Sequence, residues 1–255
     1  MAQMADRAPV WTPQALERNP HADAEKARKV QAMFAAIARS YDLNNRLHSF
    51  FQDQRWRRTA VTAAGVAPGA RVLDVACGTG DLSEAFADAD AAVTGVDFTP
   101  EMLDVARHKG AARAGSARVT YARGDAMALE FPDASFDVVS IAFGIRNVAE
   151  PARALREFRR VLRPGGRLVV LEFAEPANAL VRWGSNLYTR RIMPWTASLV
   201  ARDRSGAYHY LPRSVSTFQT PAEFAAGLRA AGFADCSATP LTMGICVLHR
   251  AVRPT

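Results

Sequence analysis

The first 66 residues carry apolar positions at the spacing of α-helices. A helix is predicted from about Ala24, because apolar residues recur there at three- and four-residue steps: Val30, Phe34, Ile37 and Ala38. A second helix is predicted over residues 44–64, and together they are expected to form a lid over residues 24–66. Residues 1–23 hold three prolines and no apolar period, so a flexible N-terminus is expected there.

From Arg71 onward, short apolar strands alternate with helices. Two of the helices begin with proline, at Pro100 and Pro151, where the missing N–H has no partner to lose. Strands that alternate with helices form a parallel sheet through right-handed crossovers. The pattern predicts a doubly wound, Rossmann-like α/β domain. Five strands are predicted, over residues 71–76, 91–96, 118–122, 136–143 and 167–173.

The pattern changes after the fifth strand. Residues 175–204 are predicted to form a mostly helical insert, and residues 221–231 another helix. Two strands follow at 233–239 and 242–250, and the link between them is too short for a helical crossover, which predicts an antiparallel hairpin. The expected fold is therefore α/β, with a mostly parallel seven-stranded sheet and an antiparallel C-terminal strand.

Composition narrows the class of protein. The 255 residues suit one domain, and 49% apolar and 22% charged residues are ordinary for a soluble globular protein. No apolar run approaches the roughly 20 residues that span a bilayer, and no signal-peptide pattern begins the chain, so a cytoplasmic protein is expected. The three cysteines share no CxxC spacing, which argues against disulfides and against a metal site.

The formal net charge of +7 comes from 29 arginines and 3 lysines. Such an excess can favour nucleic acid, anionic lipid or an anionic ligand. The arginines are scattered, however, and the two dense places, Arg55-Trp56-Arg57-Arg58 and Arg159-Arg160, are too short to be binding tails. Nucleic acid is therefore not the expected partner.

A glycine-rich turn follows the first predicted strand, with the sequence Asp74-Val-Ala-Cys-Gly-Thr-Gly-Asp81. Gly78 and Gly80 let the backbone turn sharply and approach a ligand closely. The crevice beyond the carboxyl end of such a strand is where open α/β sheets bind ligands. The turn alone fits NAD, FAD, S-adenosylmethionine (SAM) or no ligand at all.

Two details favour SAM over a dinucleotide. Ser83 stands where the G-x-G-x-x-G fingerprint has its third glycine. Asp74 precedes the turn, where a carboxylate repels a pyrophosphate but attracts the ammonium or sulfonium of SAM. Asp97 ends the second strand and can accept hydrogen bonds from ribose hydroxyls, a feature that NAD sites share. The Tyr-x-x-x-Lys pair expected of a short NAD-dependent dehydrogenase is absent from the chain.

Two further turns end predicted strands. In Gly124-Asp125-Ala126, the Asp125 carboxylate can accept a hydrogen bond from the adenine amine, with the alternative that Gly-Asp only forms a turn. In Phe143-Gly-Ile-Arg-Asn147, Arg146 and Asn147 can donate hydrogen bonds to a substrate oxygen. The alternative is a surface arginine beside a helix-capping asparagine.

Four segments of the chain form a recognisable set of motifs. They are Phe34-Ala-Ala-Ile-Ala-Arg-Ser-Tyr-Asp42 with Asn45, Ser49 and Trp56; Phe143-Gly-Ile-Arg-Asn-Val148; Arg160-Val-Leu-Arg-Pro-Gly-Gly-Arg-Leu-Val-Val-Leu-Glu-Phe173; and Leu241-Thr-x-Gly-Ile-x-Val-Leu-His-Arg250. Together they resemble those of the ubiquinone/menaquinone biosynthesis C-methyltransferases, and the resemblance covers about residues 30–250. The resemblance implies a class I methyltransferase fold with SAM as cofactor. It also implies methyl transfer to a ring carbon of a polyprenylated hydroquinone, such as demethylmenaquinol or 2-methoxy-6-polyprenyl-1,4-benzoquinol.

The resemblance also implies roles for particular residues. Ser140, two positions before Ala142 on the same strand face, is expected to replace in part the serine that the family usually has at Ala142. Tyr41 and Asp42 are placed on the lid, where they close over the substrate or accept its proton through water; aromatic packing is the alternative for Tyr41 and for Trp56. The implied cofactor contacts are Thr79, Asp97, Asp125, Ala126 and Ala142.

Three departures from the family pattern concern the acceptor: Asn44 replaces Met, Asp53 replaces His and Ala174 replaces Ser. A methyltransferase of another phenolic or prenylated molecule shows the same motifs, and a non-catalytic SAM- or nucleic-acid-binding protein is the alternative from a different class. Residues 67–174 are expected to form the SAM-binding core, and residues 175–255 the substrate-side insert and final strands. The sequence leaves the oligomeric state open, a homodimer included.

Arg146 is the candidate to stabilise a substrate phenolate, with Asn147 as its orienting partner. Residues 180–200 combine aromatic and apolar residues with arginines. Such a helical segment lies on an anionic lipid surface or packs on the core with its arginines solvated, and both interpretations stay open. In the first case the protein is associated with the inner face of the membrane.

Overall fold

The computed structural model describes residues 10–113, 119–193 and 206–255. Seven strands form one sheet: β1 Arg71–Val75, β2 Ala92–Asp97, β3 Val119–Arg123, β4 Phe136–Ala142, β5 Leu162–Phe173, β6 Ala234–Leu241 and β7 Cys246–Val252. Their order is β3-β2-β1-β4-β5-β7-β6. Strands β1 to β5 pair in parallel, whereas β7 is antiparallel to both β5 and β6. The predicted mostly parallel sheet with an antiparallel C-terminal strand is therefore confirmed.

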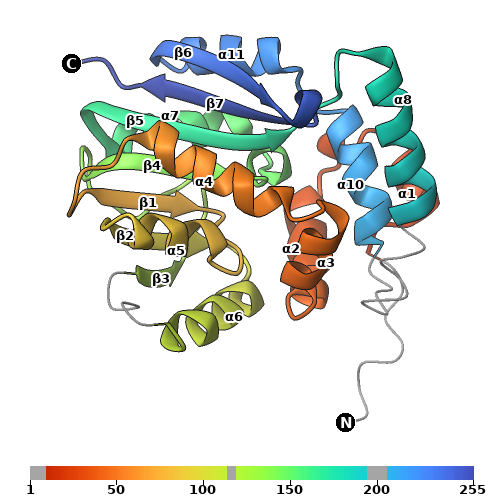
Figure 1. Ribbon diagram of the computed structural model, residues 1–255, viewed down its shortest axis with the longest axis horizontal. Helices are drawn as coiled ribbons and strands as arrows, with labels where there is room; N and C mark the ends of the chain where they lie inside the picture. Colours follow the sequence, from red (N-terminus) through yellow and green to blue (C-terminus); the bar gives the residue numbers. More distant parts are fainter. Residues whose placement is uncertain (1–9, 114–118, 194–205) are drawn as a thin grey trace.

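Helices cover both faces of this sheet (Figure 1). The α-helices are α1 Pro13–Glu17, α2 Lys26–Ile37, α3 Tyr41–His48, α4 Gln52–Ala64, α5 Asp81–Asp88, α6 Pro100–Ala111, α7 Pro151–Val161, α8 Ala179–Leu187, α10 Ala207–Ser216 and α11 Pro221–Ala230. Short 3-10 turns are η1 Pro20–Ala22, η3 Ile145–Asn147 and η5 Thr242–Gly244, and η4 Tyr188–Ile192 is a π-helical turn.

Side chains along each strand alternate between the two faces and so build two cores. Val72 and Val138 pack under α4 and α5 on one face. Leu73 and Val139 pack under α7 and α11 on the other. Because the strands are packed on both sides, their carboxyl ends form a fixed edge, and α2 and α3 lie beside it (Figure 1).

The stretch predicted as one helix over residues 44–64 consists of two helices, α3 and α4. Phe50 and Phe51 separate them, with φ angles of 52° and 60° in the left-handed region. The single-helix prediction is wrong because both phenylalanines fit the apolar pattern, while their backbone conformation is not encoded in that pattern. Helix α10 was not predicted either.

Residues 10–23 are ordered, contrary to the predicted flexible N-terminus. Trp11 is only 1% exposed, and its ring stacks on Tyr210 with 4.7 Å between the centroids. The sequence could not reveal this contact because the two aromatics lie at opposite ends of the chain. Residues 1–9 of that predicted segment, and residues 194–204 of the predicted helical insert, lie outside the described residues.

Candidate active site

Two adjoining cavities open at the carboxyl ends of the parallel strands. The first lies between these strand ends and α2, and has a volume of about 840 Å³, part of it open to solvent. The second lies between α3, α4, α8 and α10 and has about 1760 Å³, also partly open. Phe34, Tyr41 and Phe143 line both cavities and so form their junction.

The glycine turn after β1 forms one wall of the first cavity. Gly78 has a φ of +57° and lines the cavity, and a Cβ there would meet no atom within 4 Å. Gly80 has a φ of +86°, and a Cβ there would lie 2.3 Å from the Tyr121 hydroxyl. Gly78 therefore brings the backbone to the ligand, whereas Gly80 allows the turn to pack against β3.

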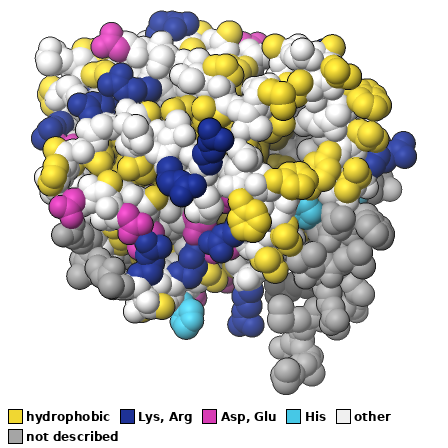
Figure 2. Space-filling view, in the orientation of Figure 1, with side chains coloured by type: hydrophobic (Ala, Val, Ile, Leu, Met, Phe, Trp, Pro, Cys, Tyr) yellow, Lys and Arg dark blue, Asp and Glu magenta, His cyan; other side chains and the backbone are white. Residues whose placement is uncertain are grey.

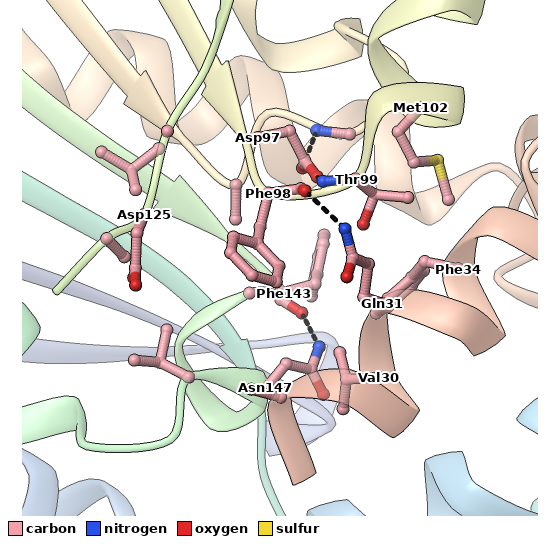
Figure 3. A pocket seen from close by; sticks show the side chains of 18 of the residues that line it. Val30, Gln31, Phe34, Asp97, Phe98, Thr99, Met102, Asp125, Phe143 and Asn147 are labelled. Carbon is pink, nitrogen blue, oxygen red and sulfur yellow. Dashed lines mark hydrogen bonds between the residues drawn. The ribbon is translucent and has the colours of Figure 1, made fainter. Parts of the chain in front are cut away.

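Asp97, at the end of β2, lines the first cavity and fixes its shape (Figure 3). Its carboxylate accepts hydrogen bonds from the backbone N–H of Gly78 and of Thr99, both at 2.8 Å. Burial raises the pKa of Asp97, and the same backbone N–H groups oppose that shift. Each carboxylate oxygen keeps a second lone pair, so Asp97 can also accept from ribose hydroxyls.

The opposite wall of the first cavity suits a flat, polar ring. Asp125 accepts a hydrogen bond from Met127 N–H at 2.8 Å through one oxygen, and among the described residues nothing donates to the other. Phe98 and Met102 line the same cavity, and Gln31 of α2 closes it by donating to Phe98 O at 3.1 Å (Figure 3). Of the predicted cofactor contacts, the structure brings five to this cavity: Gly78, Asp97, Asp125, Ala126 and Ala142.

Asp74 lies beneath the glycine turn instead of in the cavity wall. It is 1% exposed, and its two oxygens accept hydrogen bonds from Ser83 Oγ at 2.6 Å and Ser140 Oγ at 2.7 Å. Burial raises its pKa to about 6. Asp74 and Ser140, both predicted as cofactor contacts, therefore bond each other below the turn, and their contact with a cofactor stays a prediction.

The predicted Thr79 and Asp42 also lie outside the walls of both cavities. Thr79 Oγ1 donates to Asp42 at 2.5 Å, and Lys109 Nζ donates to Asp42 and to Asp81, each at 2.5 Å. The four residues, here called the lid clamp, tie α3 to the glycine turn. Asp42 thus attaches the lid to the glycine turn, and its predicted catalytic role stays a prediction. The sequence analysis missed Lys109 because its partners are distant in sequence.

Arg146, in the turn after β4, lines the second cavity but is not a free cation. It is 4% exposed, and its Nη1 donates to Glu172 at 2.6 Å and to Phe143 O at 2.7 Å. Its Nε lies 3.3 Å from Ser214 Oγ. The sequence analysis did not predict a role for Glu172, because it is a single carboxylate in an apolar strand.

Asn147 lies in the first cavity and does not bond Arg146. It accepts a hydrogen bond from the Tyr210 hydroxyl at 2.9 Å and donates to Phe143 O at 3.3 Å. The prediction that Asn147 orients Arg146 is therefore wrong. Glu172 and Ser214 orient the guanidinium, because η3 turns the two neighbouring side chains toward different cavities.

The junction of the cavities is aromatic and carries two buried guanidinium groups. Arg57 pairs with Asp53 at 2.7 Å and lies over the Phe143 ring at 5.5 Å from its centroid. Burial raises the pKa of Tyr41, and the charges of Arg57 and Arg146 act against that rise. Such a field also favours the ionised form of a phenol bound next to Tyr41. The sequence analysis noted Arg57 only as part of the arginine-rich stretch Arg55-Trp56-Arg57-Arg58 and predicted no role for it.

Trp56 packs at the same junction. Its ring lies 6.0 Å from those of Phe143 and Phe173, and its Nε1 donates to Thr242 Oγ1 at 2.9 Å. This matches the packing alternative for Trp56.

A doubly wound sheet with this glycine turn, a cavity-lining carboxylate at the end of β2 and another after β3 is typical of a class I SAM-dependent methyltransferase. Two solved structures with low identity support the fold. A SAM-dependent methyltransferase from Aquifex aeolicus has a TM-score of 0.57 at 17% identity, over 77% of this chain and 89% of that one. The second is a Haemonchus contortus phosphoethanolamine N-methyltransferase 2 in complex with SAM, with a TM-score of 0.61 at 18% identity, over 79% of this chain and 53% of that one.

Residues 22–253 match the model of the ubiE/COQ5 methyltransferase family, and the chain belongs to that family. Curated relatives cover most of the chain. The Thermus thermophilus demethylmenaquinone methyltransferase is 46% identical over 87% of this chain and 100% of its own length. The Clavibacter sepedonicus demethylmenaquinone methyltransferase is 43% identical, over 90% and 92%. The Geobacter sulfurreducens ubiquinone/menaquinone biosynthesis C-methyltransferase is 42% identical, over 88% of each chain.

Proposed function

We propose that the protein methylates a ring carbon of a hydroquinone that carries a polyprenyl tail, demethylmenaquinol or a methoxy-benzoquinol. The observation that carries this proposal is the second cavity, which is large, lined mainly by apolar side chains, and joined to the first at Phe34, Tyr41 and Phe143. An aromatic ring at that junction lies beside the first cavity while its tail occupies the second. The names of the relatives support the same acceptor.

The residues of the first cavity fit SAM. Asp97 holds the ribose, Asp125 accepts from the adenine amine, and Gly78 brings backbone N–H groups to the amino-acid end. The ionised Asp74 below the turn adds a negative potential that favours a cation above it. When bound, SAM supplies an electrophilic methyl group.

The junction prepares the acceptor for this group. A hydroquinone carbon becomes nucleophilic as the neighbouring hydroxyl loses its proton, and the fields of Arg57 and Arg146 stabilise the oxyanion in an apolar, preorganised site. Tyr41 orients the hydroxyl from the lid side. Glu172 pairs with Arg146, and Asp53 pairs with Arg57. Because these ion pairs hold the two guanidinium groups in place, the guanidiniums act on the oxyanion from fixed positions, not as mobile counter-ions.

The tail of such an acceptor is held in a membrane, so the proposal includes peripheral membrane contact. None of the helices in the described parts of the chain has the length and apolar character needed to cross a bilayer. Within the predicted contact segment 180–200, residues 180–193 are described, and they present Trp183 and Leu187 to solvent. Contact at the surface is the mode that these exposed residues support.

The test is methyl transfer by the purified protein with methyl-labelled SAM. Demethylmenaquinol and 2-methoxy-6-polyprenyl-1,4-benzoquinol are offered separately, and mass spectrometry locates the label on the ring. We expect carbon methylation of at least one quinol and none of the oxidised quinones. Methylation only of phenols without a tail would support the alternative acceptor class, and SAM binding without any transfer would contradict catalysis.

A further inference from the structure

The corner between α3 and α4 displays two phenylalanines to solvent. Phe50 is 71% exposed and Phe51 62% exposed, and both adopt the left-handed backbone that bulky residues rarely adopt. Backbone hydrogen bonds hold this corner, from Phe51 N–H to Arg46 O at 2.8 Å and from Phe50 N–H to Leu47 O at 3.2 Å. A conformation that is both strained and firmly held points to a function of the two outward rings.

Helix α8 displays a second set of apolar residues beside this corner. Leu180, Trp183 and Leu187 are 75%, 65% and 46% exposed, and their spacing of three and four residues puts them on one helix face. The Phe50 ring lies 5.8 Å from that of Tyr188, which directly follows α8, so the two sets adjoin. Figure 2 shows hydrophobic side chains gathered around a hollow on this side of the molecule. The docking face is defined as Phe50, Phe51, Leu180, Trp183 and Leu187.

The charge around the docking face is positive. Residues 43–52 and 176–193, which contain the face, include four arginines and neither aspartate nor glutamate. Arg191 is exposed, and Arg46 lies 3.7 Å from Asp81. Three carboxylates directly flank these stretches: Asp42 pairs with Lys109, Asp53 pairs with Arg57, and Glu175 lines the second cavity. Apolar rings between arginines complement an anionic bilayer, where the rings enter the acyl region and the arginines meet phosphates.

We propose that the docking face binds the surface of an anionic phospholipid bilayer, with Phe51 and Trp183 inserted below the headgroups. Phe50, Tyr188 and Pro176 line the second cavity, so the mouth of that cavity opens at the bilayer. An apolar tail then passes from lipid to cavity without crossing water. The passage of the tail rests on the proposed function, whereas the docking itself does not.

The test is co-sedimentation with vesicles of phosphatidylcholine and phosphatidylglycerol, in the absence of any quinol. Phe51→Gly and Trp183→Ser are each expected to lower vesicle affinity by about tenfold. Neither residue lines a cavity. Glycine accommodates a positive φ, so the melting temperature of Phe51→Gly is expected not to fall.

Matched charge variants complete the test. Arg191→Ala is expected to lower the vesicle affinity and to make that affinity less sensitive to salt. Arg229→Ala, on the exposed surface of α11, is expected to leave both properties unchanged. Lipids brominated in the acyl chain are expected to quench tryptophan fluorescence in the wild type and much less in Trp183→Phe.

Wild-type binding in Phe51→Gly and Trp183→Ser, or no vesicle binding by the wild type at low salt, overturns the proposal. A dimer that Phe51→Gly dissociates, without vesicle binding, overturns it too and assigns the face to a second copy. Methylation of a hydroquinone without a tail in lipid-free solution is expected to be equal in all variants. Absence of methyl transfer to tailed quinols by the wild type counts against the proposed function and leaves the docking result intact.

Discussion

Asp97 and the backbone around it show how one carboxylate organises a binding site. It receives the N–H groups of Gly78 and Thr99, which come from two different turns, and so fixes both walls at the strand edge. Asp97 also lines the first cavity, so the proposed ribose hydrogen bonds would share its two oxygens with these structural ones.

Asp97→Asn is expected to raise the dissociation constant for SAM by at least about tenfold, because the amide loses one acceptor and the charge that strengthens each bond. Isothermal titration with SAM and with its demethylated product measures the change. Asp104→Asn, on the exposed side of α6, is the matched control and is expected to bind normally. Equal affinities of the Asp97 and Asp104 variants would contradict the assignment.

Asp74 gives the stability of the protein a dependence on pH. Burial raises its pKa from 3.8 to about 6, so the folded state holds the proton more tightly than the unfolded state does. Its contribution to stability is therefore fully present below about pH 4 and is lost as the pH rises through about 6.

The free energy of unfolding of the wild type is thus expected to fall, relative to Asp74→Asn, between these two pH values. Denaturant titrations of both proteins at several pH values measure the difference. Parallel curves for the two proteins would show that Asp74 does not titrate in this range.

At the scale of elements, polar contacts between distant segments help to hold the lid to the sheet. The lid clamp joins α3 to the glycine turn and α6, and Lys26 at the start of α2 donates to Val148 O at 2.6 Å after β4. Burial lowers the pKa of Lys26 to about 8. The walls of the first cavity therefore depend on contacts between elements that are distant in the sequence.

Lys109→Met is expected to weaken SAM binding by about three- to tenfold and to speed SAM release, because it removes the cation between Asp42 and Asp81 and leaves only Arg46, 3.7 Å from Asp81, beside them. Stopped-flow binding measures both rates. Arg107→Met removes a more exposed ion pair from the same helix and is expected to change neither rate. If the two variants behave alike, the clamp does not hold the lid.

At the scale of the molecule, the two cavities have different proposed roles, the first for the cofactor and the second for the acceptor. The sheet edge forms most of the first, whereas the lid helices with α8 and α10 form most of the second. Substitutions in the second cavity are therefore expected to change acceptor use and leave the cofactor affinity intact.

Val215→Phe, which adds volume to the wall of the second cavity, is expected to lower kcat/KM for a long-tailed quinol by about tenfold, and less for a short-tailed one. The SAM dissociation constant is expected to stay within about twofold of the wild type. Steady-state kinetics over a series of tail lengths tests this, with Val215→Ala as the control. An equal loss at every tail length would place the tail elsewhere.

The sequence by itself determined the sheet, its order of elements and the ligand edge. Short apolar strands, proline helix starts and the glycine turn are local signals, and Gly78, Asp97 and Asp125 lie at or just after strand ends, so parallel pairing brings them together. The family motifs added the reaction class.

Only the tertiary structure decided which polar side chains face a ligand and which face each other. Asp74 with Ser140, Asp42 with Lys109, and Arg146 with Glu172 are pairs from distant parts of the chain, and burial makes each charge depend on its partner. The left-handed corner at Phe50 and Phe51 and the burial of Trp11 against Tyr210 were likewise invisible to local patterns, because packing far along the chain selects them.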